Sequence, residues 1–346
     1  MIVVIIAGGS GTRLWPLSTH EKPKQVINLI GERSLVQNTY TRAKNLSDKV
    51  YILTEVSHAD EIIEQLPDLP KENFIIEPAR RGTAGCIIAA LDQLHRVHGE
   101  DESIIFMSAD HQTRDNIGFA RSFEMADKIS QETGRIVLVG VEPTYPAVGF
   151  GYIEKGQAKN GGYEVAGFKE KPDYPTAKQY VNSGKYSWNA GYFVGSYKTF
   201  KREIDDVSPK LSKMLANLNA IKDVSSDQYR DTYLGFESDS IDYALIEKVT
   251  DLMMVPASFD WVDVGSYKDL HDVSDQDELG NAVLGNAHVH EVQNAYIRND
   301  EDKPIAVIGL DNIVVSNTSD GLVIARKDLS QKVGDIAKKI QKEGDK

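Results

Sequence analysis

Cysteine, basic charge and long apolar stretches are all scarce in this chain of 346 residues. The one cysteine, Cys86, cannot form an internal disulfide, which is typical of proteins kept in a reducing compartment. The first apolar run, from Met1 to Ala7, is shorter than the roughly 20 residues that a spanning helix needs. No basic segment of the kind found in signal peptides accompanies this run. The sequence therefore predicts a soluble, cytoplasmic protein with no membrane partner.

Acidic residues outnumber basic ones, with 52 Asp and Glu against 39 Lys and Arg, and the formal net charge is −13. Phosphate backbones and anionic lipids repel such a chain, so we expect no nucleic-acid partner. Hydrophobic residues at 41% and charged residues at 26% are ordinary values for a folded protein, which excludes disordered, collagen-like and coiled-coil classes. At roughly 100–200 residues per domain, the length predicts two domains.

Short β-branched runs alternate with amphipathic segments in the first part of the chain. Strands are expected at Ile2–Ala7, Val50–Thr54, Phe74–Glu77, Ile104–Met107 and Ile136–Val141. Ser34 and Gln37 have the spacing of a capping box that opens a helix, and two further helices are expected to end at Gly99 and Gly134. This alternation predicts an α/β class domain, a doubly wound, mostly parallel Rossmann-like sheet with ligands at the carboxyl ends of its strands.

The pattern changes near Leu279, where short β-runs separated by turn residues begin. A faint six-residue period through Asn281, Ala287 and Gln293 favours a β-helical solenoid, and a small β-sandwich is the alternative. An amphipathic helix follows, and its inward residues are expected to be Val333, Ile336, Ala337 and Ile340. We therefore predict one domain over residues 1–278 and a small β-rich domain with a C-terminal helix over residues 279–346.

A glycine-rich loop follows the first strand directly. Glycines let a backbone approach a ligand, and successive N–H groups can hold phosphate oxygens. The dinucleotide fingerprint needs a glycine where Leu14 stands, and the P-loop needs a Gly-Lys-Ser/Thr sequence that is absent. Arg13, Lys22 and Lys24 add positive charge. These features favour a phosphate-binding loop of a third kind, and a tight turn with solvated basic residues is the alternative.

This loop resembles the signature of the sugar-1-phosphate nucleotidylyltransferases. It runs from Gly8 to Ser18 as Gly-Gly-Ser-Gly-Thr-Arg-Leu-Trp-Pro-Leu-Ser and continues as Lys22-Pro23-Lys24-Gln25. The tryptophan and the Pro-Lys-Gln ending are similar to the guanylyltransferase branch that acts on mannose 1-phosphate. The later segments that resemble the family are Ser108–His111, Gly149–Glu154, Phe168–Pro172, Trp188–Gly191 and Phe259–Gly265. The resemblance thus covers nearly the whole chain in the expected order.

The resemblance implies that mannose 1-phosphate attacks the α-phosphorus of GTP in line, giving GDP-mannose for polysaccharide synthesis and releasing pyrophosphate. Two anionic substrates must then be neutralised and aligned, with little covalent chemistry for the protein to perform. The resemblance implies Mg²⁺ as cofactor, with Asp110 and Asp263 as its ligands and Arg13 and Lys24 as catalytic cations. Mg²⁺ commonly takes one or two carboxylates together with substrate phosphates. Taken alone, Asp110 would more commonly be a helix N-cap.

The resemblance also assigns residues that bind the substrates. For the nucleotide they are Ala7, Gly8, Gly9, Gly11, Thr12, Glu77 and Gly82, and for the sugar phosphate Gly149, Glu170, Lys171 and Asn189. A carboxylate at Glu77 matches the two donors on the edge of guanine, and an exposed carboxylate at a sheet edge is the alternative. Lys171 could equally be an exposed loop lysine. Gly82 stands where guanylyltransferases usually carry asparagine and thymidylyl relatives carry glycine, which leaves the choice of base open.

Other functions remain open at this stage. One alternative is nucleotidylyl transfer with another base or another sugar phosphate, such as a heptose phosphate. Another is a non-catalytic nucleotide-binding regulator, although Arg13, Lys24, Asp110 and Asp263 are all in place. Residues 279–346 are expected to pack against the catalytic domain or to form a homodimer. If they serve assembly alone, their deletion should change oligomer size and leave turnover per site unchanged. The segment Asp239–Tyr243 resembles a helix entry and receives no chemical role.

Overall fold

The computed structural model describes residues 1–9 and 11–344, so Ser10 of the glycine loop and the last two residues lie outside it. The chain forms two compact units. Unit 1 consists of Met1–Gly8, Tyr40–Ala109 and Thr113–Trp261, and unit 2 consists of Gly9–Thr39, Asp110–Gln112 and Val262–Lys346. The segments of the two units alternate along the sequence. The domain boundary near residue 278 stays a prediction.

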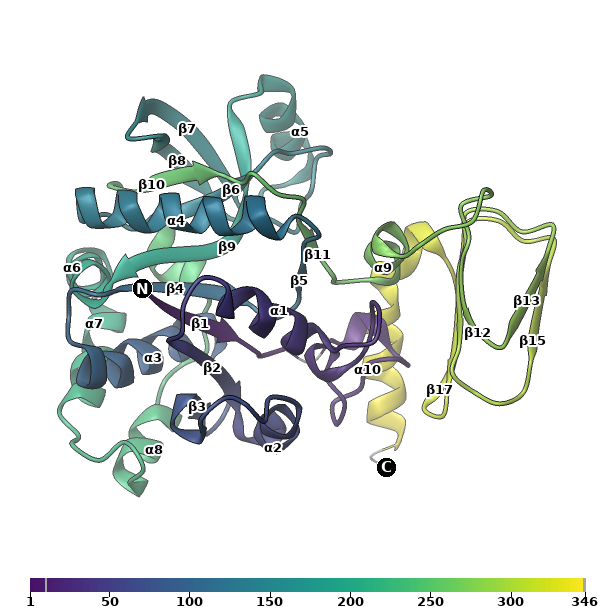
Figure 1. Ribbon diagram of the computed structural model, residues 1–346, viewed down its shortest axis with the longest axis horizontal. Coiled ribbons are helices and arrows are strands. Elements are labelled where there is room, and N and C mark those ends of the chain that lie inside the picture. Colours follow the sequence, from purple (N-terminus) through teal and green to yellow (C-terminus); the bar gives the residue numbers. More distant parts are fainter. Residues whose placement is uncertain (10, 345–346) are drawn as a thin grey trace. The chain divides into compact units, whose positions relative to one another are not determined.

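Nine strands of the described chain form the main sheet of unit 1 (Figure 1). In spatial order they are β3 (Phe74–Glu77), β2 (Val50–Glu55), β1 (Ile2–Ile6), β4 (Ser103–Ser108), β9 (Tyr186–Ser196), β6 (Val137–Val141), β10 (Met253–Pro256), β8 (Gly162–Lys169) and β7 (Tyr152–Lys159). β1 pairs in parallel with β2 and β4, and its residues are almost fully buried. The strand expected at Ile2–Ala7 is thus confirmed, and it lies between two parallel neighbours.

The sheet is mixed, so the prediction of a mostly parallel sheet is wrong. β1 to β4 run in parallel, as do β6 and β10, but β9 pairs antiparallel with β4, β6 and β7. β7 and β8 form a hairpin closed by Asn160 and Gly161, both with positive φ, as the twist of a two-residue hairpin turn requires. The coarser prediction of an α/β domain followed by a β-rich segment is confirmed.

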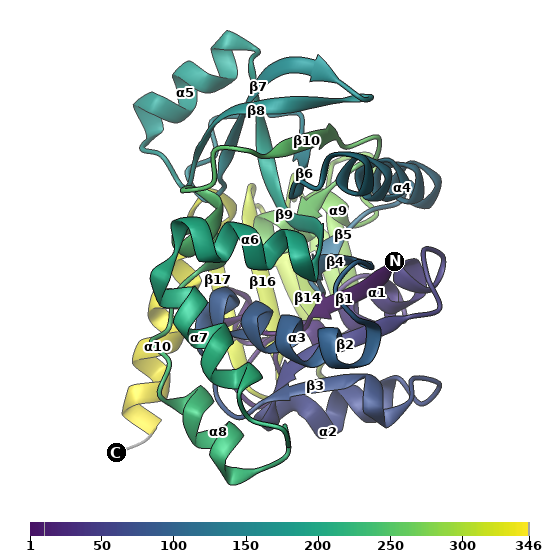
Figure 2. The same ribbon diagram turned by 90° about the vertical axis from the view of Figure 1, so that its left-hand side faces the viewer.

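The helices of unit 1 connect its strands along the chain. They are α2 (Val56–Gln65), α3 (Gly82–His98), α4 (Asn116–Thr133), α5 (Tyr174–Ser183), α6 (Tyr197–Val207), α7 (Pro209–Asn219) and α8 (Asp227–Leu234), with short turns η3 (Lys71–Asn73) and η4 (Asp242–Ile246). α3 and α4 end at Gly99 and Gly134 as predicted. Figure 2 shows α7 beside α3 and α6.

The capping box before α1 (Leu35–Lys44) is confirmed. The Ser34 N–H donates to Gln37 Oε1 at 3.1 Å, and the Gln37 N–H donates to Ser34 Oγ at 3.3 Å. These two bonds satisfy backbone donors that the first helical turn leaves without partners. Because α1 begins only at Leu35, well beyond Pro16, no α-helix opens directly at the glycine loop.

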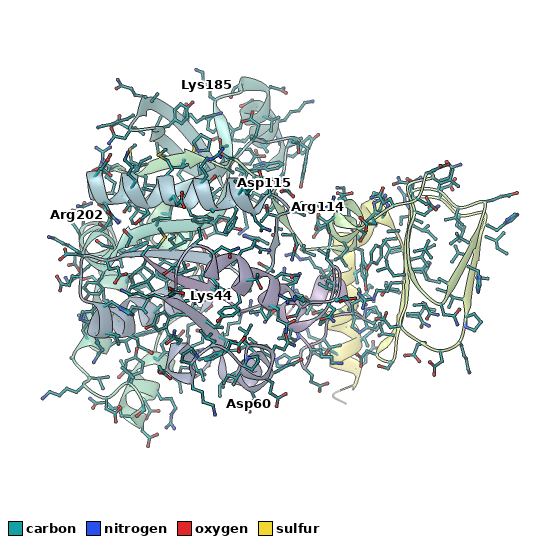
Figure 3. All side chains as sticks on the ribbon, in the orientation of Figure 1. Lys44, Asp60, Arg114, Asp115, Lys185 and Arg202 are labelled. Carbon is teal, nitrogen blue, oxygen red and sulfur yellow. The ribbon has the colours of Figure 1, made fainter. Side chains whose placement is uncertain are left out.

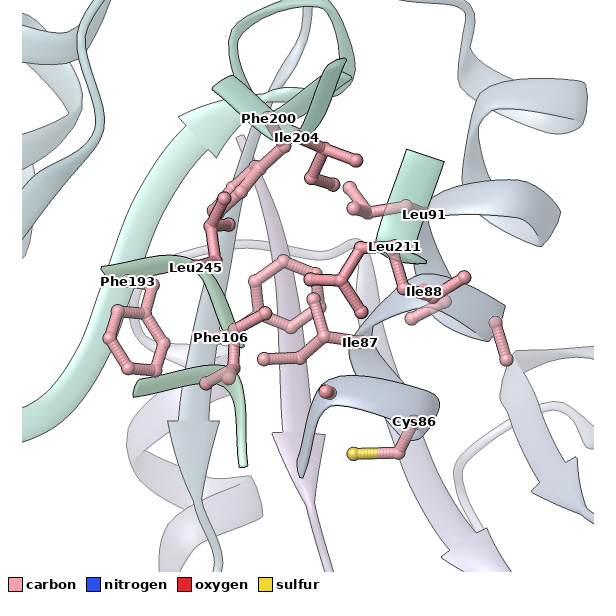
Figure 4. Packing of buried hydrophobic residues seen from close by; sticks show 14 of the residues in the cluster. Cys86, Ile87, Ile88, Leu91, Phe106, Phe193, Phe200, Ile204, Leu211 and Leu245 are labelled. Carbon is pink, nitrogen blue, oxygen red and sulfur yellow. The ribbon is translucent and has the colours of Figure 1, made fainter. Parts of the chain in front are cut away.

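Unit 1 separates charged from apolar side chains. Lys44, Asp60 and Lys185 lie exposed on its surface (Figure 3). Inside, aliphatic and aromatic residues of α3, α6 and α7 pack on β4 and β9 (Figure 4). Cys86 belongs to this cluster with 3% of its surface exposed, and its Sγ donates to the Thr83 carbonyl at 3.2 Å. The cysteine therefore serves as a small packed side chain.

Unit 2 contains a solenoid of parallel strands. Its elements are η1 (Thr12–Leu14), η2 (Lys24–Val26), β5 (His111–Gln112), β11 (Val262–Asp263), α9 (Tyr267–Val273), β12 (Ala282–Gly285), β13 (Ala287–His290), β14 (Tyr296–Asn299), β15 (Ile305–Ile308), β16 (Ile313–Thr318), β17 (Gly321–Arg326), η5 (Lys327–Lys332) and α10 (Val333–Gly344). β12, β14 and β16 form one parallel ladder, and β13 and β15 form another. Tyr296 pairs with Val314 and Ala287 with Ile305, an offset of 18 residues in each case. These stacked coils favour the predicted solenoid over the sandwich.

The core of unit 2 joins the glycine loop to the C-terminal segment. Leu14 and Leu17 pack in one buried cluster with Tyr267, Val314 and Val333. At α10 the prediction is half wrong: Val333 and Ala337 are buried as expected, but Ile336 and Ile340 are exposed. Among residues 1–9 and 11–344, none of the helices combines the length and apolar character that a membrane crossing requires.

Candidate active site

A two-stranded antiparallel ladder in unit 2 brings Asp110 and Asp263 together. β5 pairs with β11, so that His111 lies opposite Asp263, and the Val264 N–H donates to the Asp110 carbonyl at 3.3 Å. The two carboxylates, 153 positions apart in the sequence, thus become neighbours through backbone pairing. This ladder satisfies the main requirement of the predicted metal site, that its two acids converge.

Lys24 lies against both acids. Its Nζ is 2.5 Å from Asp110 Oδ2 and 3.7 Å from Asp263 Oδ1, and it donates to the Val264 carbonyl at 3.0 Å. Burial alone would lower the pKa of this ammonium group, but the attraction of Asp110 and Asp263 outweighs burial, and the net pKa is raised. Lys24 is therefore a fixed positive charge at neutral pH, held at the acid pair.

Asp110, His111 and Asp263 form a group that could hold a metal ion, because one potential ligand atom from each lies within 4.8 Å of the others. Asp263 Oδ1 is a buried acceptor without a hydrogen-bond partner among the described residues. Carboxylate oxygens suit Mg²⁺, whereas imidazole suits softer metals, so the two aspartates fit the predicted ion better than His111 does. No role was predicted for His111 from the sequence. Its position next to Asp110 was the one indication that it would lie near the predicted metal site.

The glycine loop packs closely on Lys24. Gly11 has φ 57, and a Cβ there would lie 2.4 Å from Ser18 Oγ and 3.0 Å from Lys24 Cβ. Added Cβ atoms at Gly8 and Gly9 would meet no described atom within 4 Å, so the backbone is open to a ligand there. Thr12 begins the short turn η1, in which Arg13 also lies, exposed. Ala7, at the end of β1, is buried.

Glu77 occupies a buried position at the end of β3, in unit 1. Its exposed fraction is 6%, and it accepts a hydrogen bond from the Tyr233 hydroxyl. Burial raises the pKa of Glu77 to about 7, although the Tyr233 hydrogen bond opposes the shift. An exposed carboxylate, the alternative considered from the sequence, does not describe this side chain. Tyr233 is a partner that no sequence motif indicated.

Gly82, the residue that departs from the guanylyl pattern, is required by packing. It has φ 73, and a Cβ at this position would lie 2.1 Å from the Asp239 carbonyl oxygen. The neighbouring backbone pairs closely with the same residue, since the Ala84 N–H donates to Asp239 O and the Asp239 N–H donates to Arg81 O. A side chain at residue 82 would separate these two segments.

Gly82→Ala is therefore expected to destabilise the protein by about 2–4 kcal/mol, combining left-handed strain with the backbone clash. Gly184→Ala is the matched control, because Gly184 follows α5 in the left-handed conformation, with φ 66 and ψ 6, and has open space around it. It should cost only about 1 kcal/mol. Urea unfolding of both variants measures the difference, and equal losses would contradict the packing explanation.

The predicted sugar-phosphate residues Glu170, Lys171 and Asn189 lie together in unit 1. Lys171 Nζ is 2.8 Å from Glu170 Oε1, and Glu170 is 5% exposed. Lys171 has φ 44, and its side chain is half exposed. A Cβ at Gly151 would come within 2.5 Å of Glu170 Oε2 and 3.3 Å of Asn189 Cβ, which places these two side chains side by side. The backbone at Gly149 is open, with no described atom within 4 Å of an added Cβ.

Asp242 completes this group, and the sequence analysis missed it. The Asn189 amide Nδ2 donates to Asp242 Oδ1 at 3.0 Å. Burial, and then the nearby charge of Glu170, raises the pKa of Asp242 to about 7. Asp242 begins the π-helical turn η4. Such turns are rare in proteins, and those that occur frequently lie at functional sites. The sequence of Asp239–Tyr243 indicates only a helix entry, and nothing in it shows that Asp242 is partly buried beside Asn189.

Comparison with known proteins identifies the family of this chain. Residues 2–279 match the family model of nucleotidyl transferases. Residues 287–340 match a second model, described as the MannoseP isomerase/GMP-like beta-helix domain. The two matches follow one another along the chain, in the order of the predicted α/β and β-rich regions.

Individual relatives cover nearly the whole chain. Mannose-1-phosphate guanylyltransferase RfbM of Salmonella typhimurium is 36% identical over 96% of this chain and 71% of its own. Xanthan biosynthesis protein XanB of Xanthomonas campestris pv. campestris is 34% identical over 99% of this chain and 74% of its own. A solved structure from Thermus thermophilus, described as a mannose-1-phosphate geranyltransferase, has a TM-score of 0.89 at 26% identity and covers 98% of this chain and 99% of its own. These matches confirm the resemblance found in the glycine loop, and the chain belongs to the nucleotidyl transferase family.

Proposed function

We propose that this protein is a mannose-1-phosphate guanylyltransferase, which joins GTP and mannose 1-phosphate into GDP-mannose and releases pyrophosphate. The family and the 36% identity to a guanylyltransferase over nearly the full chain support this activity. The observation that carries the proposal is the Lys24–Asp110–Asp263 cluster, a cation fixed between two converging acids. By the same relationships, with XanB among them, we assign the product to polysaccharide synthesis.

We assign Asp110 and Asp263 as the residues that would hold Mg²⁺. The bound ion would offset the negative charge of the triphosphate. Lys24 keeps the two acids in place and presents an ammonium group whose charge is constant at neutral pH. Arg13 and the backbone of Gly8, Gly9, Gly11 and Thr12 are assigned to the phosphates. Aligning two anionic substrates in this way is the main contribution expected of the protein in phosphoryl transfer.

Recognition of guanine is assigned to Glu77, supported by Ala7 and by Gly82. An ionised carboxylate can accept hydrogen bonds from N1–H and N2–H of guanine, and Tyr233 holds the Glu77 side chain in place. Because the pKa of Glu77 is raised to about 7, the fraction that is ionised increases as the pH rises from 6 to 8. Affinity for GTP should increase over the same range.

The KM for GTP should accordingly fall about tenfold between pH 6 and pH 8 in the wild type, since the ionised fraction of a group with pKa about 7 rises from roughly a tenth to roughly nine tenths over this range. In Glu77→Gln, which cannot ionise, the KM should be higher and nearly independent of pH in this range. Steady-state kinetics at several pH values test both expectations. A variant with the pH dependence of the wild type would remove Glu77 from base recognition.

The sugar phosphate is assigned to Gly149, Glu170, Lys171 and Asn189, with Asp242 added. The carboxylates and the amide can bond sugar hydroxyls, and the half-exposed Lys171 ammonium can pair with the phosphate. We further propose that residues 1–278 are the catalytic domain and that residues 279–346 contribute to packing and to a homodimer. The cytoplasmic location stays a prediction.

The direct experiment mixes the purified protein with mannose 1-phosphate, Mg²⁺ and each nucleoside triphosphate in turn, and measures released pyrophosphate. GTP should support the highest kcat/KM, and omission of Mg²⁺ should abolish release. If dTTP or ATP is preferred over GTP, guanylyl transfer is wrong and the alternative suggested by Gly82 applies. If no nucleotide yields pyrophosphate with mannose 1-phosphate, the substrate is another sugar phosphate or the chain is a non-catalytic nucleotide-binding regulator.

A further inference from the structure

The Arg13 side chain is hydrogen-bonded to the C-terminal end of the protein. Its Nη1 donates to Gln331 Oε1 at 2.9 Å, across 318 positions of sequence. Gln331 lies in the short turn η5, just before α10, and both residues belong to unit 2. The contact therefore connects the glycine loop to a segment that the sequence analysis expected to serve assembly.

Two glycines border the Arg13 side chain. A Cβ at Gly334, in the first turn of α10, would lie 2.9 Å from Arg13 Cγ, and one at Gly265 would lie 3.7 Å from Arg13 Nη1. Gly265 follows Asp263 and Val264, which both contact Lys24. The side chain of Arg13 thus runs between a C-terminal glycine and the segment that carries one of the two acids.

The same C-terminal region supports the backbone of the loop. The Tyr267 hydroxyl donates to the carbonyls of Leu14 and Trp15, both at 3.0 Å. A Cβ at Gly321 would lie 2.6 Å from the Trp15 ring, so the indole rests directly on the start of β17. Leu14 also shares its buried cluster with Val333 of α10. Several independent contacts therefore fix the residues that follow Arg13.

We infer that Gln331 and Gly334 are positioning residues that orient Arg13 for the phosphates of the nucleotide. The inference rests on the proposed function and deepens it. An exposed arginine has many rotamers, and a guanidinium held in advance loses less freedom when it meets a charged ligand. One of the five guanidinium N–H groups of Arg13 donates to Gln331, and the others can donate to phosphate oxygens. The C-terminal segment is then part of the catalytic apparatus as well as of the assembly.

Gln331→Ala tests this role. The variant should lower kcat with GTP about tenfold, the effect of losing one hydrogen bond of the strength typical for a charged group. The KM for mannose 1-phosphate and the oligomer size should not change. Gly334→Ala should reduce kcat in the same way, because the added methyl group displaces Arg13 Cγ. Gln341→Ala, a matched substitution at an exposed site of α10, should behave as the wild type.

A double-mutant cycle separates positioning from general structural damage. If Gln331 acts through Arg13, Gln331→Ala should change kcat less than about twofold in an Arg13→Lys background. Equal losses in both backgrounds, or a kcat close to that of the wild type for Gln331→Ala alone, would overturn the inference. A wild-type protein that releases no pyrophosphate would instead refute the proposed function. In that event, calorimetric titration with pyrophosphate still tests whether Gln331→Ala weakens anion binding at Arg13.

Discussion

Asp110→Asn and Asp263→Asn should each lower kcat by about a thousandfold or more, as expected when a group that holds the charge-neutralising ion is lost. Asparagine keeps the size of the side chain and one acceptor oxygen, so the β5–β11 ladder should persist. The measurement is pyrophosphate release at saturating GTP and mannose 1-phosphate over a series of Mg²⁺ concentrations. Higher Mg²⁺ should recover part of the activity, because weaker binding of the ion is the cause of the loss.

Asp60→Asn provides the matched control, since Asp60 is an exposed acid on α2 (Figure 3). Its kcat should equal that of the wild type. Circular dichroism of all three variants should show an intact fold. Turnover at the wild-type level in either site variant would refute the assignment of that aspartate, and so would a loss that appears only with unfolding.

Lys24→Met should reduce kcat by about 100- to 1000-fold, the range found when one preorganised donor is removed from a reacting centre. It should also lower the unfolding free energy by about 3 kcal/mol, because Asp110 and Asp263 would face each other without their cation. The pKa of Lys24 is raised in the fold, so its stabilising effect is complete at neutral pH and declines only as the pH rises through its native pKa. Activity assays and urea unfolding at pH 7 measure the two effects.

Lys185→Met controls for the loss of one positive charge, because Lys185 is exposed and lies in unit 1, outside the cluster. Its stability and kcat should match those of the wild type. The stability difference between Lys24→Met and the wild type should shrink as the pH rises through the native pKa of Lys24, because the wild type then loses the same positive charge. A difference that stays the same from neutral to alkaline pH would mean that packing, and not charge, explains the destabilisation.

Features that depend on neighbouring residues were predictable from the sequence. The capping box of Ser34 and Gln37 needs residues only three positions apart, and it forms as predicted. The β-branched run Ile2–Ala7 indicated a strand by its composition alone, and β1 forms there. The glycines Gly99 and Gly134 indicated the ends of α3 and α4, and both helices end there. In each case the physical cause lies within a few residues.

Features that depend on distant pairing were not predictable in the same way. β9 inserts antiparallel between β4 and β6, and nothing in its own sequence specifies these neighbours. The hairpin at Asn160 and Gly161 did carry a local signal, because Asn-Gly favours a two-residue turn, but that signal was not used. The strands on either side of Asn160 and Gly161 were therefore not predicted. The sheet was predicted to contain more parallel strand pairs than it does.

Side-chain environments were the hardest to predict. Ile336 and Ile340 are apolar and have the spacing of a helical stripe, yet both are exposed. The buried side chains of α10 include Val333 and Ala337. Asp242 is hydrophilic and stands in a segment that resembles an ordinary helix entry, yet it is partly buried beside Asn189. The period of apolar residues in a sequence indicates a helix. Which side of that helix is buried depends on the other elements that pack against it.

The β5–β11 ladder also has a consequence for biosynthesis. A chain emerging from the ribosome contains Lys24 and Asp110 when less than a third of it has been translated, but Asp263 and the Val264 carbonyl arrive after three quarters. Until then Lys24 lacks two of these three partners, and the nascent polypeptide can bind no ion between paired carboxylates. We therefore expect copies that stop before residue 263 to lack the proposed ion site and to show no turnover of GTP.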